Sequence, residues 1–361
     1  RGARAAARLT RRARECRNVP ASRFDNDSHR RYHCRHVNRR LSTLLALGAA
    51  SALTLTACAG TGGTPATSSP AEATIGVVAS TNVYGQIAEE IGGDAVTVTS
   101  IITSSAQDPH EFEPTAQDQL TVSEADLIIE NGGGYDGFMD AMIEASGTTA
   151  PVITAATFNH DYPAEGEVGE EGHDHADEDG HDHAHIEGFN EHVWYDPHTM
   201  EHLAEAIAEE LSTLDPDNAD LFETNAAAFI DQIAGLEASL DEISAAHAGT
   251  GVFVTEPVPV YLIVAAGLEN LTPEAFSEAV EEGQDVPPAT LLEALGIVED
   301  GSVKVVIANA QTGGAETTQV IDAATAQSIP VLEFTETLRE GQTYISWMQQ
   351  NIAELADALD A

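Results

Sequence analysis

The chain has 361 residues, 42% of them hydrophobic, which is enough for two domains with packed cores and excludes a disordered acidic tail. Of its 15 basic residues, 13 lie in residues 1–57, so residues 58–361 carry 57 acidic and two basic residues, a net charge of −55. Such a charge repels phosphate backbones and favours cations, so nucleic-acid binding by this part is close to excluded.

The first 57 residues are predicted to be a leader rather than part of the fold. Residues 1–36 are rich in arginine and lack apolar periodicity. We interpret these residues as sequence upstream of the true translation start, with Val37 as an alternative first residue. The other interpretation is a genuine basic extension. From Val37 a basic segment leads into an apolar run over 41–55, a pattern typical of a secretory signal and too short to span a membrane.

The tetrapeptide Leu-Thr-Ala-Cys at 55–58 resembles the lipobox of bacterial lipoproteins. The resemblance implies cleavage before Cys58, lipidation of that residue and an extracytoplasmic chain anchored to the cell membrane. The other two cysteines, Cys16 and Cys34, lie in the leader. A mature chain with one lipidated cysteine forms no disulfide and no thiolate metal site, so a metal has to be bound by histidine and carboxylate.

Residues 58–73 have the Gly, Ser, Thr and Pro content of a flexible tether. After the tether, buried strands alternate with helices, which is typical of a parallel sheet covered on both faces. The expected strands are 74–79, 96–102, 126–130 and 151–153, and the expected helices are 83–91, 114–125 and 136–145.

Residues 161–187 interrupt this alternation. They hold 11 acidic residues, five histidines and almost no large apolar side chains, so they cannot fold on their own. A helix is expected over 199–214, followed by a long helical stretch over 216–247. Its larger apolar residues are Phe222 and then, every three to four positions over about four turns, Phe229, Ile233, Leu236, Leu240 and Ile243.

A second series follows, with strands expected at 252–254, 304–308 and 330–334 and helices at 258–266, 289–298, 316–326 and 344–359. The sequence therefore predicts an α/β fold of two lobes, each with a mainly parallel sheet flanked by helices, joined by one long linking helix. The expected boundaries are 74–215 for the N-terminal lobe, 216–247 for the linking helix and 248–361 for the C-terminal lobe.

Two histidines lie in distinctive segments at the ends of predicted elements. His110 belongs to Asp-Pro-His-Glu-Phe-Glu-Pro-Thr at 108–115, between a strand and a helix, and His192 belongs to Glu-His-Val-Trp-Tyr-Asp-Pro at 191–197. In open α/β sheets ligands bind at such loops.

These two segments, with Asn-Gly-Gly-Gly-Tyr-Asp at 131–136, resemble the zinc and manganese substrate-binding lipoproteins of bacterial ABC importers. The resemblance covers residues 74–360. It implies a metal ion held between two lobes, with His110 and His192 as ligands from the first lobe. By the same resemblance the second lobe provides Glu256, after the strand at 252–254, and Glu336, after the strand at 330–334. Glu256 departs from the histidine common in zinc importers.

Two neutral imidazoles and two carboxylates suit tetrahedral Zn²⁺, whereas bidentate carboxylates also admit Mn²⁺. The loop at 161–187 favours zinc, because imidazole prefers zinc over manganese. In zinc-specific members of the family a loop of this composition stands at this place. We expect it to gather Zn²⁺ weakly through His173, His175, His181, His183 and His185, the other interpretation being a solvated charged loop. His198 and His202 have a chelating i, i+4 spacing, but two exposed helix residues are the favoured interpretation.

The sequence thus predicts a lipid-anchored, monomeric protein that captures Zn²⁺ as transported substrate and delivers it to an ABC importer permease with a cytoplasmic ATPase. No catalysis is expected. One alternative is a manganese-binding transport component or adhesin of the same fold. A remote alternative is a zinc hydrolase with Glu256 or Glu336 as general base, for which no HExxH segment is present.

Overall fold

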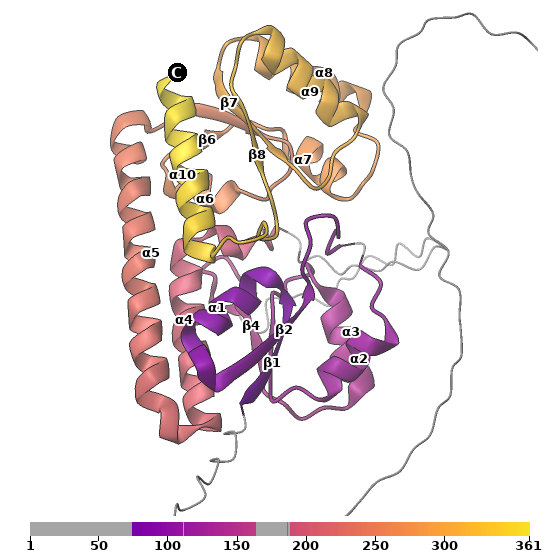
Figure 1. Ribbon diagram of the computed structural model, residues 1–361. Coiled ribbons are helices and arrows are strands. Elements are labelled where there is room, and N and C mark those ends of the chain that lie inside the picture. Colours follow the sequence, from indigo (N-terminus) through magenta and orange to yellow (C-terminus); the bar gives the residue numbers. More distant parts are fainter. Residues whose placement is uncertain (1–73, 111, 164–185, 187) are drawn as a thin grey trace, which may run out of the picture. The chain divides into compact units, whose positions relative to one another are not determined.

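A computed structural model describes residues 74–361 apart from Glu111, 164–185 and Glu187, and these residues belong to one compact unit (Figure 1). The predicted leader, the predicted tether with Cys58 and the five loop histidines lie outside the described residues. Among those described, no helix has the length and apolar character needed to cross a membrane.

The first half of the unit is a four-stranded parallel sheet with the strand order β2-β1-β3-β4. The central strands β1 and β3 are buried almost throughout, as the continuous apolar runs in the sequence predict. The elements are β1 (Ile75–Thr81), α1 (Asn82–Gly92), β2 (Val96–Ile102), α2 (Ala116–Ser123), β3 (Leu127–Glu130), α3 (Gly137–Ser146), β4 (Val152–Thr154) and α4 (Pro197–Leu214).

The second half is also a four-stranded parallel sheet, with the order β6-β5-β7-β8. Two of its elements, the short strand β6 and the helix α7, were not predicted from the sequence. The elements are β5 (Gly251–Val254), α6 (Val260–Ala265), β6 (Glu269–Asn270), α7 (Glu274–Glu281), α8 (Pro288–Glu299), β7 (Val303–Asn309), α9 (Ala315–Ala326), β8 (Val331–Phe334) and α10 (Tyr344–Asp360).

The long helix α5 (Ala219–His247) connects the two halves in the chain and runs alongside both of them (Figure 1). It packs against α1 and α4 from the first half and against α6 and α10 from the second. All six of its predicted apolar positions are buried, in a core cluster that includes residues from both sheets. The predicted α/β fold of two parallel sheets and a linking helix is confirmed.

Candidate metal centre

His192 lies immediately before a short 3-10 helix, Val193–Tyr195, and its side chain is 1% exposed. The next helix, α4, begins with Asp196, whose carboxylate accepts the His198 backbone N–H, and with a proline at its first position. This start keeps the chain before Asp196 out of the helix, and the ring of His192 reaches Glu281 of the second half, with Nε2 3.4 Å from its Oε1.

A hydrogen bond assigns the tautomer of His192. Its Nδ1 lies 2.7 Å from Asn190 Oδ1, and the other end of the Asn190 amide donates to the Pro257 carbonyl at 3.0 Å. An amide oxygen accepts and does not donate, so Nδ1 of His192 carries the proton. The nitrogen with the lone pair, and therefore the ligand atom, is Nε2.

His110 lies in the loop between β2 and α2, where its backbone N–H donates to Asp108 Oδ1 at 2.9 Å. Its ring meets the ring of Tyr135 edge-on, with centroids 5.0 Å apart, and the ring of His192 at 6.1 Å. The loops that carry the two histidines therefore meet around Tyr135, whose ring is also 5.8 Å from that of His192.

A run of three glycines positions Tyr135. Gly132, Gly133 and Gly134 have φ values of 73°, 70° and 103°, in the left-handed region that favours glycine. A Cβ on Gly132 would overlap the side chain of Thr154 as well. The tight turn brings the hydroxyl of Tyr135 to Glu336 Oε2, to which it donates at 3.1 Å. The Asn-Gly-Gly-Gly-Tyr segment is thus part of the site through the side chain of Tyr135, which the glycine turn positions.

Glu256 and Glu336 follow β5 and β8, and the last residue of the strand between them, Asn309 of β7, joins them. The Asn309 amide donates to Glu256 Oε2 and to Glu336 Oε1, both at 2.7 Å. The hydroxyl of Thr312 donates to the other oxygen of Glu256. Because the strands are parallel and adjacent, their carboxyl ends place these carboxylates at one edge of the sheet.

The structure brings three of the four predicted ligands together. His110, His192 and Glu336 each offer one ligand atom within 4.8 Å of the other two. Glu256 joins no group of three at this distance within the described part of the chain, although Asn309 ties it to Glu336. Imidazole nitrogen and carboxylate oxygen are donors that divalent zinc and manganese accept.

Two further acidic residues, Glu191 and Glu281, lie at the same site, and the sequence analysis did not identify them as candidate ligands. His110, Glu191 and Glu281 form a second group with ligand atoms within 4.8 Å of one another. Glu281, at the end of α7, places Oε1 3.4 Å from His192 Nε2. The one signal in the sequence was the apolar spacing of Phe276 and Val280 after Pro273, which indicates a short helix but not the direction of Glu281.

Burial raises the pKa of the carboxyl groups around the site. Desolvation raises the pKa of Glu336 to about 8 despite the hydrogen bond from Asn309, and the charges of Asp108 and Glu256 add to the rise. Desolvation also raises the pKa of Glu256, and it raises that of Glu281 to about 10 together with the charges of Glu191 and Glu256. A dication that binds these oxygens has to displace protons from them.

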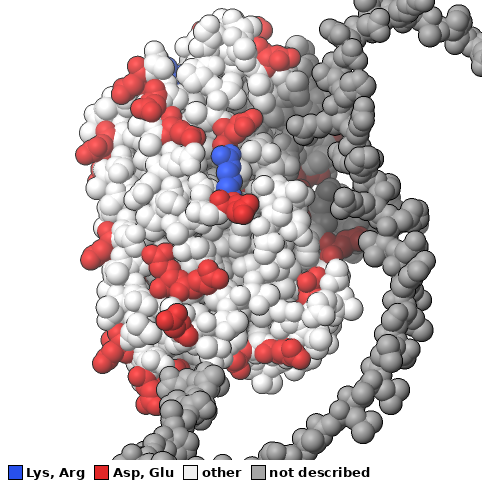
Figure 2. Space-filling view, viewed as in Figure 1, with Lys and Arg blue, Asp and Glu red and all other residues white. Residues whose placement is uncertain are grey.

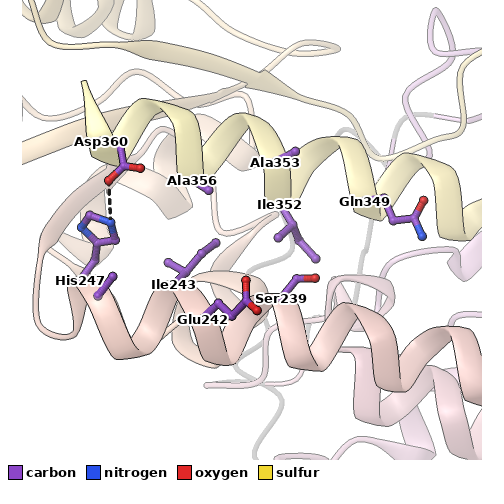
Figure 3. Close-up of a pocket in the computed structure, with 10 residues that line it drawn as sticks. Ser239, Glu242, Ile243, His247, Gln349, Ile352, Ala353, Ala356 and Asp360 are labelled. Atoms are coloured by element: carbon purple, nitrogen blue, oxygen red, sulfur yellow. Dashed lines mark ion pairs between the residues drawn. The ribbon is translucent and has the colours of Figure 1, made fainter.

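The remaining described histidines lie elsewhere. His198 forms a group with Glu201 and Glu237 on the surface of α4 and α5, where its side chain is 58% exposed, and its ring is 4.7 Å from that of His202. The ring of His247 is 3.3 Å from Asp360 at the end of a cavity of about 290 Å³ between α5 and α10 (Figure 3). This cavity shares no residue with the metal centre.

Comparison with known proteins finds similar metal-transport proteins. Residues 77–358 match the family model of the periplasmic zinc-uptake complex component A. The manganese ABC transporter substrate-binding lipoprotein PsaA of Streptococcus pneumoniae is 30% identical over 351 residues, 89% of this chain and 99% of the relative. The zinc-binding lipoprotein AdcA of the same species is 26% identical over 281 residues, 76% of this chain and 54% of the relative.

A solved structure shows the same fold. The crystal structure of ZnuA superposes with a TM-score of 0.62 at 21% identity and covers 80% of this chain and 100% of its own. The family is one of transport components and not of enzymes, and its curated members bind zinc or manganese. The chain belongs to the zinc- and manganese-binding substrate-binding proteins of bacterial ABC importers.

Proposed function

We propose that the chain captures Zn²⁺ between its two halves through His110, His192 and Glu336, with Glu256 as the fourth ligand, and delivers it to its importer. The observation that supports this most is the convergence of two imidazoles and a carboxylate within 4.8 Å, contributed by loops from both halves. By the same proposal Cys58 is lipidated and holds the chain on the extracytoplasmic face of the membrane.

The ligand proposal is tested by His110→Ala and His192→Ala. Each substitution removes one of the neutral donors, so the dissociation constant for Zn²⁺, measured by competition with a chelator, should rise by about 100-fold or more. His160→Ala is the matched control, because this histidine is 65% exposed and belongs to no ligand group in the described part of the chain. Unchanged affinity in either of the first two variants would remove that residue from the ligand set.

The choice of zinc rests on the histidines of the segment 161–187. Because imidazole favours zinc over manganese, five imidazoles in this segment bias metal collection towards zinc. Replacing all five with serine should lower the number of zinc ions bound per chain, measured by equilibrium dialysis at a fixed free Zn²⁺ concentration, and leave one tight site. A zinc content equal to that of the unchanged chain would contradict a collecting role for this segment.

Manganese is the second candidate, favoured by the carboxylates at the centre and by the 30% identity to a manganese lipoprotein. Carboxylate oxygens suit Mn²⁺ better than Zn²⁺, and Glu256, Glu281 and Glu336 all lie in or beside the site. Titration of the purified chain with Zn²⁺ in the presence of excess Mn²⁺ decides between the metals. Retention of Mn²⁺ under these conditions would overturn the zinc proposal while leaving metal capture intact.

A further inference from the structure

Glu281 is the residue at this site with no counterpart in the predicted ligand set. It ends α7, a helix of the second half that lies between β6 and α8. Its side chain is 12% exposed, and it reaches both histidines: it forms a group with His110, and its Oε1 is 3.4 Å from His192 Nε2. Its neighbour Glu282 is exposed to solvent.

The contact with His192 joins two electron-pair donors. Nδ1 of His192 carries the proton that it shares with Asn190, so the atom facing Glu281 is the nitrogen with the lone pair. A lone pair and a carboxylate oxygen at 3.4 Å attract one another when a cation or a proton lies between them. A divalent metal ion is the cation that imidazole and carboxylate bind together.

The separation of the two atoms agrees with a shared metal ion. Bonds from Zn²⁺ to imidazole nitrogen and carboxylate oxygen are about 2.0–2.2 Å long, and at a tetrahedral angle this places adjacent ligand atoms about 3.4 Å apart. Nε2 of His192 and Oε1 of Glu281 already stand at 3.4 Å. An ion between them needs no rearrangement of these two side chains relative to one another.

Glu281 differs from Glu256 and Glu336 in its hydrogen bonds. Both oxygens of Glu336 accept hydrogen bonds, from Asn309 and from Tyr135. Both oxygens of Glu256 accept hydrogen bonds, from Asn309 and from Thr312. Oε1 of Glu281 is buried and accepts no hydrogen bond from the described residues. A buried carboxyl oxygen of this kind is stabilised by a proton or by a cation that binds it.

We propose that Glu281 is a further direct ligand of the captured metal ion, in addition to His110, His192, Glu336 and Glu256. The proposal rests on the proposed function, since it concerns the same ion. It makes α7 part of the metal site and adds an oxygen donor to the set. Because oxygen donors favour Mn²⁺ more than Zn²⁺, Glu281 also sets the balance between the two metals.

The test is Glu281→Gln, which keeps the shape of the side chain and weakens it as a ligand. Dissociation constants for Zn²⁺ and Mn²⁺ are measured by chelator competition on the unchanged chain, on this variant and on Glu282→Gln, which makes the same change of charge one residue away. We expect Glu281→Gln to weaken Zn²⁺ binding by at least about 10-fold, and Mn²⁺ binding by more, with Glu282→Gln within twofold for both metals.

Equal affinities of the unchanged chain and Glu281→Gln would overturn the proposal for Glu281, while tight binding by the unchanged chain would still support metal capture. Failure of the unchanged chain to bind either metal would overturn both. Should Glu281→Gln fail to fold, as judged by circular dichroism, a crystal structure of the metal-loaded unchanged chain decides the matter. A Glu281 oxygen at about 2.0–2.2 Å from the ion supports the proposal, and a separation beyond about 3 Å refutes it.

Discussion

At the scale of single residues, buried carboxyl groups also occur away from the metal centre. Glu130, the last residue of β3, is buried, and its Oε1 accepts a hydrogen bond from Thr154 at 2.8 Å. Oε2 has no hydrogen-bond partner among the described residues. Desolvation, with the charges of Asp136 and Asp140, raises the pKa of Glu130 to about 8. The folded chain therefore holds a proton here that the unfolded chain loses near pH 4.5.

This proton predicts how the stability of the metal-free chain depends on pH. Between pH 4.5 and 8 the folded state binds more protons at Glu130 than the unfolded state, so the free energy of unfolding falls as the pH rises. Glu130→Gln mimics the protonated acid and removes this loss. Relative to the unchanged chain, the variant should gain on the order of 1–4 kcal/mol between pH 5 and pH 8, measured by urea unfolding.

Glu144→Gln is the control for this measurement, since Glu144 is exposed on α3 in the same half. The difference in the free energy of unfolding between Glu144→Gln and the unchanged chain should be the same at pH 5 and at pH 8. A Glu130→Gln variant whose difference also stays constant would show that Glu130 has an ordinary pKa in the folded chain.

Whether the position of a site residue could be predicted from the sequence depends on the element that carries it. His110, His192, Glu256 and Glu336 stand next to strands or helix starts that the sequence pattern predicts, and a parallel sheet gathers such positions at one edge. Their roles as ligands remain proposals. Glu281 follows no strand, and its direction depends on how α7 packs through Phe276, which is fully buried. Packing of this kind is set by the tertiary fold and not by a local pattern.

At the scale of elements, α5 is the helix whose sequence pattern was most informative. The pattern predicted 216–247 and the structure has Ala219–His247, because 29 residues with apolar side chains every three to four positions bury one continuous stripe. The short elements β6 and α7 were missed. The strand β6 has two residues, both exposed, so it shows no apolar pattern. Strong periodicity over a long segment is what made α5 predictable.

Two helical glycines predict opposite effects on stability. Gly235, inside α5, has open space where a Cβ would be added. Gly235→Ala should therefore raise the free energy of unfolding by about 0.5–1 kcal/mol, because alanine loses less backbone entropy on folding. Gly92, at the end of α1, is buried, and a Cβ there would overlap both γ-methyl groups of Val96. Gly92→Ala should destabilise the chain by about 1–3 kcal/mol.

Urea unfolding of the metal-free chain measures both variants against the unchanged one. Metal affinity should stay the same for Gly235→Ala, since α5 provides no residue to the metal centre. A loss of stability in Gly235→Ala would mean that α5 needs the backbone freedom of glycine at this position. A bend in the helix between the two halves would require such freedom.

At the scale of the whole molecule, charge is the dominant feature. The described residues contain two basic residues, Lys304 and Arg339, among many acidic ones. On the face shown in Figure 2, acidic side chains are spread over the surface and a basic side chain lies among them. Acidic side chains at this density repel one another more in the folded chain than in the expanded unfolded chain. The same field attracts cations, so it supports the function while it lowers the stability.

Screening by salt should therefore stabilise the metal-free chain. Raising NaCl from 0.01 M to 0.5 M shortens the Debye length from about 30 Å to below 8 Å, which removes most of the repulsion between surface carboxylates. We expect the free energy of unfolding at pH 7.5 to rise on the order of 1 kcal/mol, and the rise at pH 4.5 to be clearly smaller because many carboxyl groups are then protonated. Choline chloride should act like NaCl, since screening does not depend on which cation provides it. A gain from NaCl that choline chloride fails to reproduce would point to sodium binding at particular carboxylates, and equal gains at both pH values would show that repulsion does not limit the stability of this fold.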